Sequence, residues 1–158
     1  MKTTTPLRLI LLAVMILGLT LTAGAQTHVY HGNSTYTSDI IYTYANGHLY
    51  HGRSTYTSDI IYTYASSHIY SGRSTYSSDI LYTYAKSHIY HGRSTYTSDI
   101  VLTYDNRYIY RGNSLYSSDI LYTYDGRHLY RGRSTYTSDI LLTFSNPLPA
   151  YVLLSIIL

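Results

Sequence analysis

The 158 residues include 23 tyrosines but only one phenylalanine, no tryptophan and no cysteine. Lysine and arginine together number 11 and aspartate and glutamate 8, a balance too even for the basic face that nucleic-acid binding needs. Without cysteine there is neither a disulfide nor a lipid-carrying thiol, so stability must come from packing and backbone hydrogen bonds. Composition thus excludes a nucleic-acid-binding protein, a disulfide-stapled domain and a lipoprotein.

The N-terminal segment, residues 1–25, has the pattern of a secretory signal peptide. Lys2 and Arg8 supply positive charge, residues 9–19 form an uncharged apolar stretch, and Ala23-Gly24-Ala25 offers small residues for cleavage. The apolar stretch is shorter than the about 20 residues that a membrane-spanning helix needs. We therefore expect cleavage, a mature chain with no membrane span, and a location outside the cell or in its envelope. The mature chain keeps nine basic and eight acidic side chains, a net charge near +1.

Six copies of a 20-residue repeat make up residues 26–147. The copies begin at residues 28, 48, 68, 88, 108 and 128, without insertion or deletion. One glycine recurs at a fixed position in every copy: Gly32, Gly52, Gly72, Gly92, Gly112 and Gly132. A uniform period predicts that each copy makes the same local structure and buries its apolar face against its neighbours.

Each copy contains two short segments of β character. Residues 40–44 read Ile-Ile-Tyr-Thr-Tyr and residues 48–51 read His-Leu-Tyr-His, too short and too regularly β-branched or aromatic for a helix. Asn46-Gly47 lies between them, and Asp125-Gly126 takes this place in another copy. Both pairs favour a two-residue hairpin turn, in which both central residues need a positive φ, whereas Ser66-Ser67 is a weaker signal.

The other connection in each copy is a polar turn. Gly52 suits a backbone conformation that a Cβ would hinder, and Ser58 and Asp59 suit hydrogen bonds to nearby backbone. Serine hydrogen bonds and the recurring arginine, Arg53 in this copy, are expected to compensate the carboxylates. Tyr56 lies within the turn and is expected to fold back over a neighbouring copy. The aspartates assigned to this turn are Asp39, Asp59, Asp79, Asp99, Asp119 and Asp139.

The predicted fold is all-β. We expect tandem 20-residue β-hairpins that form an open meander or hairpin solenoid, and the hairpin turn signals favour this over the alternative, a parallel β-helix or β-solenoid. Pro147 and Pro149 interrupt the pattern, and residues 148–158 are almost entirely apolar. We expect this segment to be a cap, either a last strand or a plug over the open end of the sixth copy. The alternative is a tail that serves surface attachment or secretion.

The sequence argues against an enzyme and indicates no cofactor. Gly32-Asn33-Ser34-Thr35-Tyr36 lacks the second glycine of a nucleophile elbow, and catalysis needs one unique pocket where this chain repeats its groups six times. The histidines His48, His68 and His88 share one row, and imidazoles favour Zn²⁺ or Cu²⁺. His51 faces away from His48, and Tyr108 interrupts the row, so we assign no metal site.

The tyrosines carry the strongest functional signal. Two rows share one strand face: Tyr42, Tyr44, Tyr62, Tyr64, Tyr82, Tyr84, Tyr122 and Tyr124. The rows are either the core of the sheet or an exposed surface suited to stacking on sugar rings or to pairing with a protein. The expected partner is a glycan, a cell-surface protein or a second copy of the chain.

Residues 111–127, Arg-Gly-Asn-Ser-Leu-Tyr-Ser-Ser-Asp-Ile-Leu-Tyr-Thr-Tyr-Asp-Gly-Arg, resemble uncharacterised exported repeat proteins of bacteria, a resemblance that covers residues 28–147 and implies no activity. The period and hairpins also resemble choline-binding repeats, without their tryptophans, and curli-type fibre subunits, without their Gln/Asn ladders. We expect a secreted, non-enzymatic structural or adhesive protein. The alternative is a self-assembling, amyloid-like fibre subunit, because the window Asp-Ile-Ile-Tyr-Thr-Tyr is β-prone and low in charge.

Overall fold

The computed structural model describes residues 26–158, and the predicted signal peptide lies outside this range. The strands are β1 (Thr27–His31), β2 (Ile40–Ala45), β3 (His48–His51), β4 (Ile60–Ala65), β5 (His68–Ser71), β6 (Ile80–Ala85), β7 (His88–His91), β8 (Ile100–Tyr104), β9 (Tyr108–Arg111), β10 (Ile120–Tyr124), β11 (His128–Arg131) and β12 (Ile140–Phe144). One-turn 3-10 helices precede six of them, at Thr37–Asp39, Thr57–Asp59, Ser77–Asp79, Thr97–Asp99, Ser117–Asp119 and Thr137–Asp139. Helix α2 (Ala150–Ile156) ends the chain.

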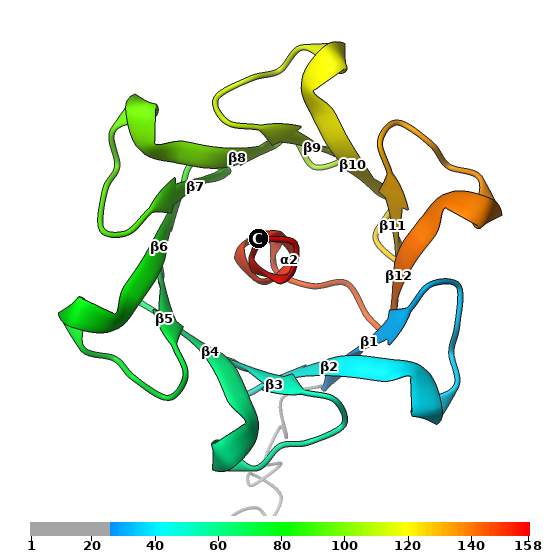
Figure 1. The fold of residues 1–158 in the computed structure, drawn as a ribbon, viewed down its shortest axis with the longest axis horizontal. Helices are drawn as coiled ribbons and strands as arrows, with labels where there is room; N and C mark the ends of the chain where they lie inside the picture. Colours follow the sequence, from blue (N-terminus) through cyan, green and yellow to red (C-terminus); the bar gives the residue numbers. More distant parts are fainter. Residues whose placement is uncertain (1–25) are drawn as a thin grey trace, which may run out of the picture.

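The twelve strands form one closed antiparallel sheet. Each strand pairs with its neighbours in sequence, and β1 pairs with β12, so the order β1-β12-β11 and on to β2 returns to its start. Figure 1 shows a six-fold ring with loops that point outward. The all-β class and the tandem 20-residue hairpins are confirmed. The open meander or solenoid and the parallel β-helix were wrong, because the first strand of the chain pairs with the last and closes the ring.

The tight turns have the geometry that their sequences predict. Asn46 and Gly47 have φ of 52° and 75°, and Ser66 and Ser67 have 49° and 65°. Two successive positive φ values characterise the hairpin turn that matches the twist of the flanking strands. The Ser-Ser pair therefore forms the same turn, although a positive φ strains the backbone of serine more than that of glycine.

A β-bulge recurs wherever one hairpin meets the next. Ile41 is skipped in the pairing of β2 with β1, so Tyr42 lies opposite Val29. The carbonyl of Ile41 instead accepts a hydrogen bond of 2.7 Å from the N–H of Gly52, whose φ is +59°. Both Ile41 and Tyr42 then pack against the core. The bulge thus bends the strand and starts the outward loop at the same point.

The sheet is packed on both faces. Its inner wall carries a row of fully buried aliphatic residues: Val29, Leu49, Ile69, Ile89, Ile109 and Leu129. On the outer face, Tyr50 is 5% exposed and Thr43 is completely buried. The hydroxyl of Thr43 donates to the carbonyl of Gly52 at 2.7 Å, a bond repeated around the ring that ties each outer loop to its hairpin.

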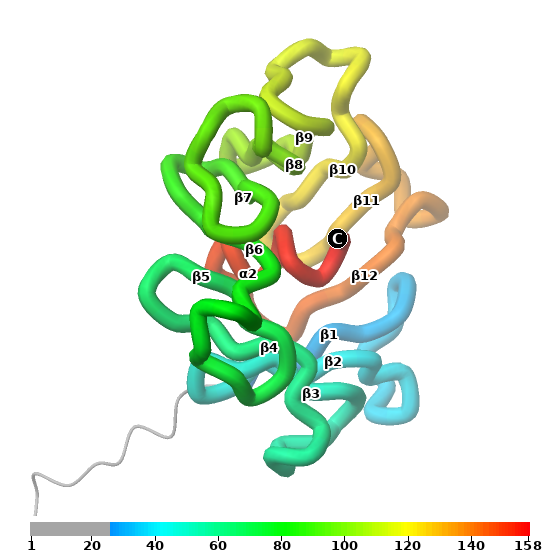
Figure 2. Tube along the Cα trace, turned by 60° about the vertical axis from the view of Figure 1, so that its left-hand side comes forward, coloured from blue at the N-terminus to red at the C-terminus, as the bar shows by residue number. Residues whose placement is uncertain are grey.

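Helix α2 occupies the lumen of the ring, where Figures 1 and 2 place it among the strands. Val152, Leu153 and Leu154 have no exposed surface. The expected cap is therefore an internal helix and not a last strand. Pairing of β1 with β12 leaves no strand edge for the C-terminus to cover, whereas the apolar lumen needs filling. Within residues 26–158, no helix is long and apolar enough to cross a membrane.

Candidate functional site

The six outer loops, residues 32–39, 52–59, 72–79, 92–99, 112–119 and 132–139, are built by the same hydrogen bonds. In the second loop the Ser54 hydroxyl donates to the Asp59 carboxylate and accepts from the N–H of Tyr56 at 3.0 Å. The N–H of Asp59 donates to the carbonyl of Tyr56 at 3.0 Å. These bonds fix the backbone on both sides of the tyrosine, so the loop is ordered by its own polar groups.

The turn-forming aspartates take part in this network. The hydrogen bond from Ser34, with a second from Ser38, lowers the pKa of Asp39, which keeps its carboxylate ionised. Arg53 and its equivalents do not contribute, because the one ion pair among residues 26–158 joins His128 to Asp125. Serine compensation is therefore observed, and the expected arginine compensation is not.

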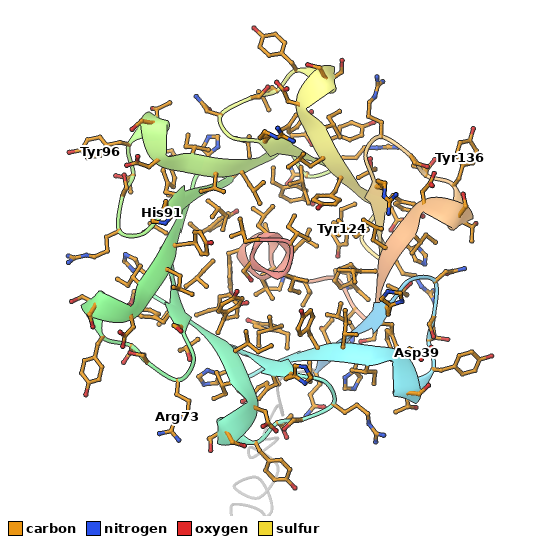
Figure 3. The ribbon with its side chains drawn as sticks, in the orientation of Figure 1. Asp39, Arg73, His91, Tyr96, Tyr124 and Tyr136 are labelled. Atoms are coloured by element: carbon orange, nitrogen blue, oxygen red, sulfur yellow. The ribbon has the colours of Figure 1, made fainter. Side chains whose placement is uncertain are left out.

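A tyrosine stands outward at the tip of every loop. Tyr36, Tyr56, Tyr76, Tyr96, Tyr116 and Tyr136 are 76–77% exposed, and Figure 3 shows Tyr96 and Tyr136 pointing away from the ring. The expectation that this tyrosine folds back over a neighbouring copy was wrong. Closure of the sheet splays successive loops around a circle (Figure 1), and the high exposure of these tyrosines means that no neighbouring loop covers their side chains.

The two tyrosine rows singled out in the sequence line the inner wall instead. Tyr44 and Tyr64 meet edge to face, with ring centroids 5.8 Å apart, and the Tyr64 hydroxyl lies 2.6 Å from that of Ser155 in α2. Tyr42 and its equivalents in the other row pack against the same core. Burial raises the pKa of Tyr64. The structure therefore places both rows around the plug, with little of either on the outside.

The histidine row is held apart. His48 Nδ1 lies 3.0 Å from the hydroxyl of Thr63, which gives its own proton to the carbonyl of Gly72. The histidine must therefore donate, which places the proton on Nδ1. Burial lowers the pKa of His48. Residues 26–158 contain no group of three or more metal-ligating side chains, so His48, His68 and His88 do not converge.

No nucleophile and base come together in the outer loops. The Ser54 hydroxyl donates directly to the Asp59 carboxylate, so no histidine lies between them as it would in a catalytic triad. This hydrogen bond orders the loop. The expectation of a non-enzymatic protein stays a prediction, and this contact agrees with it.

The molecule also contains one pocket next to the plug. It has a volume of about 320 Å³ and is lined by Tyr64, Ala65, Ser66, Ser67, His68, Ile69, Tyr84 and Tyr151. Tyr151 of α2 lies between the rings of Tyr64 and Tyr84, at centroid distances of 5.5 and 5.8 Å. This pocket could not be predicted from the sequence, because it depends on the position of α2 in the lumen. The outer tyrosines were visible in the sequence as a sixfold aromatic position inside a polar turn.

Fold and surface define a class: a closed, six-fold β ring with a helical plug and six outer loops built by the same hydrogen bonds. The chain belongs to the family described as 6-fold beta flower protein, which matches residues 29–157. No curated protein and no solved structure matches the chain.

Proposed function

We propose that the protein is an exported, non-enzymatic adhesive module whose six outer loops bind a repetitive cell-surface glycan. The observation that carries this proposal is the sixfold presentation of one tyrosine, 76–77% exposed, on loops already ordered by hydrogen bonds. An ordered loop pays little conformational entropy on binding, and a tyrosine offers an apolar ring face together with a hydroxyl.

The surroundings of each tyrosine suit a sugar. In the second loop Thr55, Thr57 and Arg53 are exposed beside Tyr56, and in the first loop Asn33 takes the place of the arginine. These side chains offer hydrogen bonds without concentrating one sign of charge. Six such sites on a rigid ring engage a repeating polymer together, and avidity then exceeds single-site affinity by roughly 10²–10⁴-fold.

The alternative, a self-assembling fibre subunit, has less support. A fibre that grows by strand addition needs an unpaired edge, and every strand within residues 26–158 has two neighbours. The β-prone window begins at Asp39, and its residues 40–44 belong to β2, which is already paired on both sides.

The test is binding of residues 26–158 to immobilised surface polysaccharides, with tyrosines replaced by alanine in three alternate loops or in all six. We expect a graded loss, about 10-fold or more for three and below detection for six, because avidity falls with each lost contact. The melting temperature should hold, since these side chains are exposed. Leu115→Thr, which gives the fifth loop the residue of the others, is the matched control. Unchanged binding by the sixfold variant would refute the proposal.

A further inference from the structure

The ring is six-fold, but its plug is not. The chain enters the lumen from the end of β12, and on that side Leu148 and Phe144 are buried next to Tyr124. On the far side α2 brings Tyr151 against Tyr64 and Tyr84, and its Ser155 hydroxyl lies 2.6 Å from that of Tyr64. A single helix with one entry segment fills a six-fold lumen unevenly, and the pocket of about 320 Å³ lies where the filling is thin.

The turn beside this pocket carries small side chains. Ser66 and Ser67 form the turn, whereas the next copy has Lys86 in the place of Ser66. Both residues at this position have nearly the same φ, 49° and 48°. The pocket mouth is therefore left open by the identity of one side chain and not by a different backbone.

We propose that this pocket binds one neutral six-membered ring that bears hydroxyl groups, a function separate from binding at the outer loops. Three tyrosines, Ala65 and Ile69 supply most of the lining, and no aspartate, glutamate, lysine or arginine contributes. Aromatic walls favour the flat face of a ring, and the absence of charge disfavours an ion. The volume of about 320 Å³ is at the lower end of the range for ligand pockets, which favours one ring over a longer ligand.

The lining also offers polar groups for the hydroxyls. Within residues 26–158, the hydroxyls of Ser66, Ser67 and Tyr84 make no hydrogen bond, and that of Tyr151 makes only a long one of 3.4 Å to Tyr44. Ser66 and Ser67 are exposed, so a ligand hydroxyl can replace water at their side chains and keep its own hydrogen bonds in the pocket. The second cavity, of about 420 Å³, is lined by Arg107 and Asp125 among others and lacks this neutral character.

His68 provides a local reporter. It lines the pocket, and its buried Nδ1 has no hydrogen-bond partner within residues 26–158, whereas the Nδ1 atoms of His28, His48 and His88 contact threonine hydroxyls. Ring resonances of His68 should therefore shift when the pocket fills, and those of the other three should not.

The experiment is an NMR titration of residues 26–158 with methyl glycosides of glucose, galactose, mannose and N-acetylglucosamine, and separately with p-cresol. We expect saturable shifts at His68 with a Kd near 1 mM, about −4 kcal/mol for a single ring. Ser66→Lys, which installs the side chain that the next copy already accepts, should weaken binding about 10-fold or more without loss of stability. Lys86→Ser is the matched control and should leave the titration unchanged.

The outcomes separate the two ring chemistries and the two sites. Shifts with a glycoside identify a sugar, and shifts with p-cresol alone identify a phenolic ring. No saturable shift with any probe, or shifts that Ser66→Lys does not weaken, would overturn the proposal. The variant without the six outer tyrosines should keep these shifts, and Ser66→Lys should keep polysaccharide binding, so either function can fail while the other stands.

Discussion

Val29 lies directly opposite Phe144, and through this pair the first strand of the ring joins the last. Around it, the N–H of Ser145 donates to the carbonyl of His28 at 3.0 Å, and the hydroxyl of Thr143 donates to the carbonyl of Gly32 at 2.7 Å. The same contacts occur in the five hairpins that a tight turn connects. The sixth hairpin is thus completed by two distant parts of the chain.

Deletion of residues 26–31 should open the ring and make the protein aggregate. The loss of β1 leaves β12 and β2 each with an unpaired edge, which is a template for pairing with another chain. We expect the intact chain, residues 26–158, to sediment as a stable monomer over days. The deleted chain should grow into large species with a strand spacing of about 4.8 Å in fibre diffraction.

Growth of such species by the intact chain under the same conditions would contradict this prediction. It would also revive the fibre hypothesis, since assembly would then proceed without a free edge.

The plug should be a major source of stability. Leu153 has no exposed surface, so Leu153→Ala leaves a cavity in the lumen and should lower the free energy of unfolding by about 2–5 kcal/mol. Leu158, which is 41% exposed, is the matched control, and Leu158→Ala should change stability by less than about 1 kcal/mol. Urea denaturation measures both, and equal effects would mean that α2 does not support the ring.

Local features of the fold were predictable because they depend on short stretches of sequence. Asn46-Gly47 specifies its hairpin turn, and through the turn it specifies the pairing of β2 with β3. Closure was not predictable in this way. Nothing in the sequence around Val29 indicates that β1 pairs with β12. Whether the hairpins close into a ring depends on small rotations between strands that accumulate over six copies.

The candidate sites show the same division. Tyr44 and Tyr56 are both tyrosines in a β-rich repeat, and composition does not say which one faces inward. The bulge at Ile41 and the closure of the ring decide it, by turning the strand face to the lumen and the loop to solvent. Prediction of the pocket beside Ser66 would also have required the position of α2, whose Tyr151 lines it.

The Ser-Ser type of turn should be open to improvement. Ser87 has a φ of 67°, which costs an L-residue roughly 1–2 kcal/mol, and glycine avoids this cost while losing roughly 0.5–1 kcal/mol in chain entropy. Ser87→Gly should therefore raise the free energy of unfolding by about 0.5–1 kcal/mol. The reverse change, Gly47→Ser at a φ of 75°, should lower it by a similar amount. A stabilising Gly47→Ser in thermal denaturation would show that φ does not govern these turns.

The buried tyrosines should make the ring sensitive to alkali. Burial, together with the charges of Tyr124 and Asp105, raises the pKa of Tyr104 to about 12. A tyrosine in the unfolded chain has a pKa near 10. The folded state therefore binds more protons between about pH 10 and 12, so stability is complete below pH 10 and falls as the pH rises through this window.

Replacement of Tyr104 by phenylalanine tests this directly, because it removes the ionising hydroxyl and keeps the ring. The free energy of unfolding of Tyr104→Phe should fall less steeply with pH than that of the parent, by up to about 1.4 kcal/mol per pH unit. The difference should appear only above pH 10, since below it the phenol is neutral in both states. Urea midpoints at pH 8 and pH 11 suffice for the comparison. Equal slopes for parent and variant would mean that Tyr104 ionises in the ring as readily as in the unfolded chain, and that its burial does not oppose the charge.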